Sequence, residues 1–151
     1  MNRWRSAVDA RLGAILALAV LPWSLVFANG ELTLVFPFGL VDPRPLYLTD
    51  LITFVTVRTG GLPQFLLSWP IGVGIYLLAV ASTASGMLFG REDRRVTAAL
   101  LVLVGLTQLS MAWGFSRRIG TVAVPLGTLL SWAVVWWFDW PALREAATVR
   151  E

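Results

Sequence analysis

Hydrophobic residues fall into four long runs, and the charged residues lie between these runs or near the two ends of the chain. The runs cover residues 12–28, 64–90, 96–115 and 119–138, and none of them contains Asp, Glu, Arg or Lys. At about 1.5 Å of rise per residue, each run as a helix is long enough, or nearly so, for a hydrocarbon core of about 30 Å. The pattern therefore predicts an all-α integral membrane protein with four transmembrane helices.

The first connection, residues 29–63, is long enough to have structure of its own. Its early part, residues 32–41, is too apolar for open water but is interrupted by Pro and Gly, which favours contact with the bundle or the headgroup layer. Residues 46–57 then place Thr and Asp on one helical face and large apolar residues on the other. This predicts an extracytoplasmic amphipathic helix or lid, with a strand as the alternative because residues 52–57 are rich in β-branched side chains.

Composition agrees with a single membrane domain over residues 1–151. Hydrophobic residues make up 57% of the chain and charged residues 14%, against about 25% charged residues in soluble domains. The net charge is +3, and all twelve basic residues are Arg, scattered among the connections. Such scatter does not predict nucleic-acid binding. The expected partner is the lipid bilayer.

The distribution of arginines predicts the orientation of these spans. Eight arginines lie on the side of both termini and four on the opposite side, so the positive-inside rule places both termini in the cytoplasm. Arg117 and Arg118 conflict with this, because they fall in a tight external hairpin. The predicted localisation is the cell membrane, as a multi-pass protein.

The first run has an alternative interpretation as a secretory signal peptide. Three arginines precede an apolar segment, residues 12–21, and residues 26–28 resemble a small-residue cleavage site. The apolar run nevertheless continues to Ala28, and the rest of the chain is itself apolar. Retention as a first span is the preferred interpretation.

Missing residue types exclude most catalytic chemistry. The chain has no Cys and no His, so it lacks the usual ligands of zinc, haem and iron–sulfur clusters and the most common general base. No carboxylate lies inside a run to couple transport to an ion. The sequence therefore predicts a protein that is not an enzyme and has no catalytic residues, metal ligands or cofactors.

Small and polar residues inside the runs mark candidate helix contacts. Ser82, Gly86 and Gly90 lie on one stripe of the second run, and such stripes let helix backbones approach closely in lipid. Gln108 lies near the middle of the third run, where an amide needs a hydrogen-bond partner on a neighbouring helix. These four residues are the candidate packing positions.

The connection before the second run holds the candidate interaction surface. Its charged side chains surround the segment expected to form the surface helix, and they are Asp42, Arg44, Asp50 and Arg58. The alternative is that these four residues only form the solvent-exposed face of a lid and bind no partner.

Residues 34–43, LVFPFGLVDP, combine with the spacing of the four runs and the short Arg-rich second connection to suggest a family. The chain resembles a group of small uncharacterised membrane proteins of halophilic archaea, some of whose genes lie beside a vitamin B12-type ABC permease. The resemblance implies a four-span protein without an established enzymatic activity, and it makes an ABC-type permease a candidate partner.

Two functions remain compatible with the sequence. The preferred one is an accessory or assembly subunit that packs against another membrane protein in a larger complex. The alternative is a small-solute permeation or substrate-capturing unit without ion coupling, in which Gln108 and the Ser and Thr residues of the second and fourth runs line a polar path.

Overall fold

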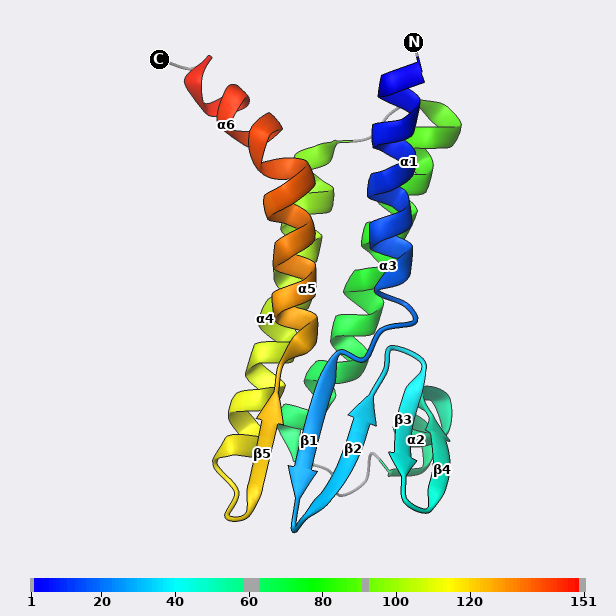
Figure 1. Ribbon diagram of the computed structural model, residues 1–151, viewed down its shortest axis with the longest axis vertical. Helices are drawn as coiled ribbons and strands as arrows, with labels where there is room; N and C mark the ends of the chain where they lie inside the picture. The colour runs from blue at the N-terminus through cyan, green and yellow to red at the C-terminus, as the bar shows by residue number, and fades with distance from the viewer. Residues whose placement is uncertain (1, 59–62, 91–92, 150–151) are drawn as a thin grey trace.

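Helices lie side by side, and an antiparallel sheet packs against one end of this helical layer (Figure 1). The computed structural model describes residues 2–58, 63–90 and 93–149. Helices α1, α3, α4 and α5 run alongside one another, and the sheet lies at the end of the molecule remote from both termini. The elements in chain order are α1 Asn2–Ala17, β1 Ser24–Ala28, β2 Glu31–Val35, β3 Gly39–Pro43, β4 Leu46–Asp50, α2 Leu51–Arg58, the 3₁₀ helix η1 Gln64–Leu67, α3 Ser68–Phe89, α4 Arg94–Ser116, β5 Thr121–Val124, α5 Leu126–Val134, the π-helix η2 Val135–Asp139 and α6 Trp140–Thr148.

Local sequence signals end α3 and start α4. Gly90 adopts a left-handed conformation with φ of 67°, and its N–H donates to the carbonyl oxygen of Gly86 at 3.0 Å, which is a common way to close a helix. Asp93 caps α4, because its carboxylate accepts the backbone N–H of Arg95 at 2.9 Å. Two long helices therefore pack side by side as a hairpin.

The sheet begins with a tight hairpin between β1 and β2. Asn29 and Gly30 have positive φ values of 53° and 85°, which is the backbone conformation that a two-residue hairpin turn requires. Strands β3 and β4 form a second hairpin, and β5 returns after α4 to pair with β1. The strand order is β4-β3-β2-β1-β5, so β1 lies between a neighbour in sequence and a strand from the far end of the chain.

Trp23 joins the sheet to the helices. It is 1% exposed, and its indole N–H donates to the carbonyl oxygen of Leu18 at 2.7 Å. Its ring packs edge-to-face on Tyr76, with centroids 5.4 Å apart. The hydroxyl of Tyr76 in turn donates to the carbonyl oxygen of Ile15 at 2.7 Å. The hydrophobic core therefore continues from the sheet into the space between α1 and α3.

The prediction of four transmembrane helices is wrong at the first and last runs. Run 12–28 divides into the end of α1, a turn and the whole of β1. Run 119–138 begins with β5 before α5 starts at Leu126. Apolar residues fill buried strands as well as helices, so a run of them does not by itself distinguish the two. The breaks were present in the sequence as Pro22 and the Asn29–Gly30 pair.

The all-α class and the four-helix bundle are therefore overturned, because the chain is mixed α/β with a five-stranded sheet. Within the described residues, two helical segments are long and apolar enough to cross a membrane, Gln64–Phe89 and Arg94–Ser116. They correspond to the middle two predicted runs. The predicted four-span, multi-pass localisation with both termini in the cytoplasm is not supported.

The segment predicted as one amphipathic helix is part strand and part helix. Residues 46–50 form β4 and residues 51–58 form α2. The extracytoplasmic helix or lid is thus replaced by a sheet edge followed by a short helix. Phe54 of α2 is 5% exposed and packs edge-to-face on Trp69, so α2 is fastened to the core by its apolar face.

Candidate binding cleft between two strands of the sheet

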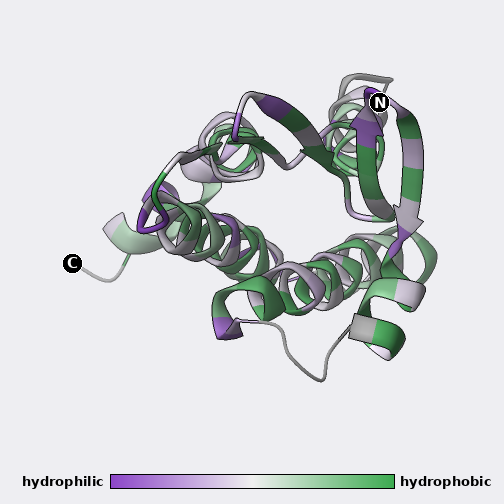
Figure 2. Ribbon diagram, turned by 90° about the horizontal axis from the view of Figure 1, so that it is seen from below, coloured by the Kyte–Doolittle hydropathy of each residue, from purple (hydrophilic) through white to green (hydrophobic). Residues whose placement is uncertain are grey.

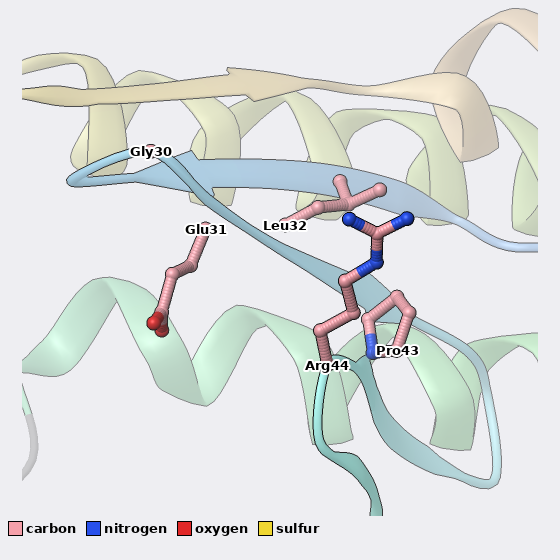
Figure 3. A pocket seen from close by; sticks show the side chains of 5 residues that line it. All are labelled: Gly30, Glu31, Leu32, Pro43 and Arg44. Carbon is pink, nitrogen blue, oxygen red and sulfur yellow. The ribbon is translucent and has the colours of Figure 1, made fainter.

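A cleft opens between β2 and β3 at the end of the sheet remote from the two chain termini (Figure 3). Its volume is about 550 Å³, and its walls are formed by Gly30, Glu31, Leu32, Pro43 and Arg44. This volume lies within the range of about 300–1,000 Å³ that is usual for ligand pockets. Among the predicted surface residues, Arg44 lines the cleft directly.

The cleft exists because the β2–β3 ladder stops early. The pairing covers Leu34 with Val41 and Val35 with Leu40, although both strands continue for several residues. Continuing the register would place Leu32 opposite Pro43 and Glu31 opposite Arg44, and these residues line the cleft instead.

Pro43 explains where the ladder stops. Phe36 and Gly39 exchange backbone hydrogen bonds of 2.8 and 3.3 Å at the hairpin between the strands. In an antiparallel pair, bonded positions recur at every second residue, so Leu32 and Pro43 would be a bonded pair. Pro43 has no N–H to donate. Without this donor the pair formed by Leu32 and Pro43 would have one hydrogen bond fewer, and the strands separate at this pair.

A side-chain hydrogen bond closes the inner end of the cleft. The hydroxyl of Thr33 donates to Oδ1 of Asp42 at 2.6 Å. This bond holds β2 and β3 together one position before they separate. Asp42, a predicted surface residue, therefore supports the cleft from its base.

The two charged residues of the cleft point in different directions. Figure 3 shows the side chain of Arg44 extending across the cleft toward β2 and the carboxylate of Glu31 directed away from the guanidinium. Both charged residues are exposed, and no ion pair joins them. The cleft therefore offers one cation and one anion that do not pair with each other.

Asp50 and Arg58 lie apart from this cleft, at the two ends of α2. The carboxylate of Asp50 accepts the backbone N–H of Thr53 at 2.9 Å and so caps the helix. Hydrogen bonds from the Thr53 side chain and from its backbone N–H lower the pKa of Asp50 below the usual 3.8. Arg58 ends α2, and its side chain lies outside the described part of the structure.

The Asp50 cap predicts loss of α2 protection in acid. Because the pKa of Asp50 is lowered in the folded state, its contribution is complete above the unfolded value and disappears as the pH falls through the folded value. We expect amide-exchange protection factors in α2 to be lower at about pH 2.5 than at about pH 5, because the loss begins near the unfolded value of about 4 and continues below it. An Asp50→Ser variant, which caps without titrating, should keep the same protection at both pH values. Equal acid sensitivity in this variant would contradict the assignment.

The predicted packing stripe runs along α3 toward its end. The hydroxyl of Ser82 lies 2.7 Å from that of Thr97, which joins α3 to α4. Gly86 accepts the hydrogen bond from Gly90, which closes the helix, and open space surrounds the position where a Gly90 side chain would lie. The stripe thus contains one polar contact and one helix terminus.

Gln108 lies in a tightly packed part of the interior. It is 0% exposed, and its Oε1 accepts from the hydroxyl of Ser24 at 3.5 Å. A side-chain carbon on Gly72 of α3 would lie 2.9 Å from Nε2 of Gln108, and one on Gly127 of α5 would lie 3.1 Å from its Cγ. Gln108 therefore sits where β1, α3, α4 and α5 meet, and glycines make room for it.

A buried ion pair was missed by the sequence analysis. Arg11 of α1 and Asp139 of η2 form a salt bridge of 2.9 Å, and their side chains are 3% and 0% exposed. Each residue lies one position outside a predicted apolar run. The prediction of orientation places Arg11 among the arginines of the cytoplasmic side, and no prediction concerns Asp139. The available signal was the helical pattern of residues 2–17, which turns Arg11 toward the same side as the buried Ile15. Asp139 ends a π-helical segment, a conformation found often at functional positions.

Within the described ranges, no three acidic side chains converge in a way that could hold a metal ion. The charged groups that line the cleft are the carboxylate of Glu31 and the guanidinium of Arg44. They can bind opposite charges and accept or donate hydrogen bonds.

Comparison with known proteins identifies a family. Neither the curated proteins nor the solved structures contain a match to this chain. A family model described as "Domain of unknown function (DUF8050)" matches residues 2–149, which is nearly the whole sequence. The chain therefore belongs to the DUF8050 family.

Proposed function

We propose that this protein is a non-enzymatic accessory or assembly subunit that associates with a lipid bilayer through α3 and α4 and contacts another membrane protein through its sheet. The observation that carries the proposal is the large apolar surface that these two helices leave exposed. A monomeric soluble protein rarely exposes a continuous apolar patch of more than a few hundred Å².

Exposure distinguishes these helices from the core helices of a soluble protein. In their most apolar stretches, 28% of the α3 segment and 44% of α4 is buried, whereas a core helix is mostly covered. The exposed large side chains of the two helices are Ile71, Leu77, Leu78, Met87, Leu88, Phe89, Val96, Val102, Leu103, Leu106, Leu109 and Trp113. Figure 2 shows hydrophobic colouring over most of the helical ribbons.

Polar groups lie where a bilayer would end. Asp93, Arg94 and Arg95 stand at the start of α4, and Arg117 and Arg118 follow its last residue. At about 1.5 Å per residue the 23 residues of α4 give a length close to the roughly 30 Å hydrocarbon core. Trp113, 70% exposed, lies near one end, where membrane interfaces favour Trp.

The alternative of a permeation path finds less support. Gln108, on which a polar path would depend, is enclosed by Ser24 and by the glycines of two helices. The groove between α1 and α5 has apolar walls, formed by Ala14, Ala17, Leu18, Leu21, Leu130, Ala133, Val134, Trp137 and Phe138. Such walls suit a lipid chain or a partner helix better than a polar solute.

Flotation with phosphatidylcholine vesicles tests the proposal. We expect the wild-type protein to float with the vesicles and to resist extraction by alkaline carbonate. Leu78→Arg and Leu106→Arg, in the exposed middle of α3 and α4, should each reduce insertion about 100-fold, since Arg at a helix centre costs about 2.5–3.5 kcal/mol. Leu48→Arg, equally exposed but on β4, is the matched control and should float like the wild type. A wild-type protein that stays monomeric in buffer without vesicles or detergent would contradict the proposal.

A further inference from the structure

We infer that the cleft between β2 and β3 binds an extended peptide segment of the partner protein, with an acidic side chain next to a basic one. This inference deepens the proposed function by naming the contact that the sheet makes. It rests on the backbone groups that face the cleft and on the placement of its two charges.

Backbone groups in the cleft are ready to pair with another strand. By the alternation that Phe36 and Gly39 establish, the N–H and C=O of Leu32 point toward β3 rather than toward β1. The pairing with β3 ends before Leu32, and Pro43 on the opposite wall contributes a C=O without an N–H. An extended segment can supply the donors and acceptors that the opposite wall does not, as in the addition of a strand to a sheet.

The charges favour an extended peptide over a compact ligand. Successive side chains of an extended chain point in opposite directions, and the side chains of Arg44 and Glu31 also point away from each other (Figure 3). A carboxylate on one residue of the peptide can therefore meet the guanidinium of Arg44, which binds carboxylates in a bidentate manner. The next residue can present a cation to Glu31. A small zwitterion would have to reach both charged groups at once.

Closure of the strands on each other is the principal competitor. Closure would pair Glu31 with Arg44. The adjacent pair, Leu32 with Pro43, would then lack one of its two hydrogen bonds, because proline has no N–H. The free edge of β4 is a second competitor, because Leu46, Tyr47 and Leu48 are exposed there. That edge offers apolar side chains without the pair of opposite charges, which favours the cleft.

Three fluorescein-labelled peptides test the inference on the full chain in dodecyl maltoside micelles. Each carries the fluorescein on its N-terminal amine through an uncharged spacer and is amidated at its C-terminus, with the sequences Thr-Val-Glu-Lys-Val-Thr, Thr-Val-Glu-Glu-Val-Thr and Thr-Val-Lys-Lys-Val-Thr. We expect fluorescence anisotropy to show roughly threefold to fivefold tighter binding of the mixed-charge peptide, the effect of one exposed charge pair. Equal affinity for all three peptides, or binding of none of them, would overturn the inference.

Charge variants should change the preference in a defined direction. Arg44→Glu makes both charged positions of the cleft acidic, so the Lys-Lys peptide should become the tightest ligand. Glu31→Arg makes both positions basic and should favour the Glu-Glu peptide. A preference that does not follow these changes would show that the peptides bind elsewhere.

Pro43→Val tests the shape of the cleft without changing its charges. Valine restores the N–H that lets the ladder continue, so we expect the strands to close and the affinity for all three peptides to fall at least tenfold. Leu48→Arg on β4 is the control and should leave the preference among the three peptides as it is in the wild type. Retained binding by Pro43→Val, an altered preference in Leu48→Arg, or a wild-type dimer that Arg44→Glu dissociates would each overturn the inference.

Vesicle flotation of the same protein variants, assayed without detergent, separates this inference from the proposed function. Variants that float like the wild type but lose the peptide preference report on the cleft alone. If the wild-type protein shows the peptide preference but does not float with vesicles, the inference about the cleft is supported and the bilayer proposal is refuted.

Discussion

An Arg11→Met variant should lose about 3–5 kcal/mol of unfolding free energy, because it leaves the carboxylate of Asp139 buried without its cation. Both side chains are almost fully buried, so water cannot replace the lost partner. For a chain of this size the melting temperature should fall by about 6–20 °C, since each kcal/mol shifts it by about 2–4 °C. Thermal unfolding in dodecyl maltoside, followed by circular dichroism, measures the shift.

The double variant Arg11→Met/Asp139→Leu distinguishes loss of the pair from loss of packing. Replacing both charges with apolar groups removes the desolvation cost together with the attraction, and such exchanges are often neutral or stabilising. We therefore expect the double variant to recover most of the lost stability. Arg95→Met, on an exposed arginine of α4, is the control and should melt within about 2 °C of the wild type, as surface substitutions usually do. A double variant as unstable as the single one would show that the pair is not the source of the effect.

The sequence was sufficient for α3 and α4 because their signals are local. Each is one uninterrupted apolar run, and the junction between them has a glycine that closes one helix and an aspartate that caps the next. Neither signal depends on the rest of the fold. Run boundaries 64–90 and 96–115 therefore agree closely with the helices observed.

The sheet was missed for two reasons, one in its local hairpins and one in its single pairing between strands distant in the sequence. The Asn29–Gly30 turn is a strong hairpin signal that apolar continuity obscured. Strand β5 has no such local signal, since four apolar or β-branched residues before Pro125 are compatible with the start of a helix. Its identity depends on pairing with β1, which no local pattern in the sequence reveals.

The candidate surface was predicted in part. Asp42 and Arg44 were selected as charges in an otherwise apolar connection, and they lie at the base and wall of one cleft. The role of Pro43 could not be predicted, because it follows from the register between β2 and β3. Asp50 was placed on the polar face of a helix, whereas it precedes the helix and caps it.

The second large effect is expected at Gly72, where α3 approaches α4. A side-chain carbon there would meet the hydroxyl of Thr107 and lie 2.9 Å from Nε2 of Gln108. Gln108 is completely buried, and the hydroxyl of Thr107 already donates to the carbonyl oxygen of Val104 at 2.7 Å. Gly72→Ala should therefore cost about 1–3 kcal/mol, as overpacking of a well-packed core does. Gly72→Val should cost more, because the helices must separate further.

Gly74 is the matched control for Gly72, because it lies two residues away on the exposed side of the same helix. A side-chain carbon at Gly74 would have no atom within 4 Å, so Gly74→Ala should be neutral or stabilise the helix by up to about 1 kcal/mol. The two alanine variants have the same composition. The melting temperature of Gly72→Ala should lie below that of the wild type, and that of Gly74→Ala should equal or exceed it. Equal melting temperatures for the two variants would show that α3 and α4 do not meet at Gly72, and that the helix hairpin packs through another face.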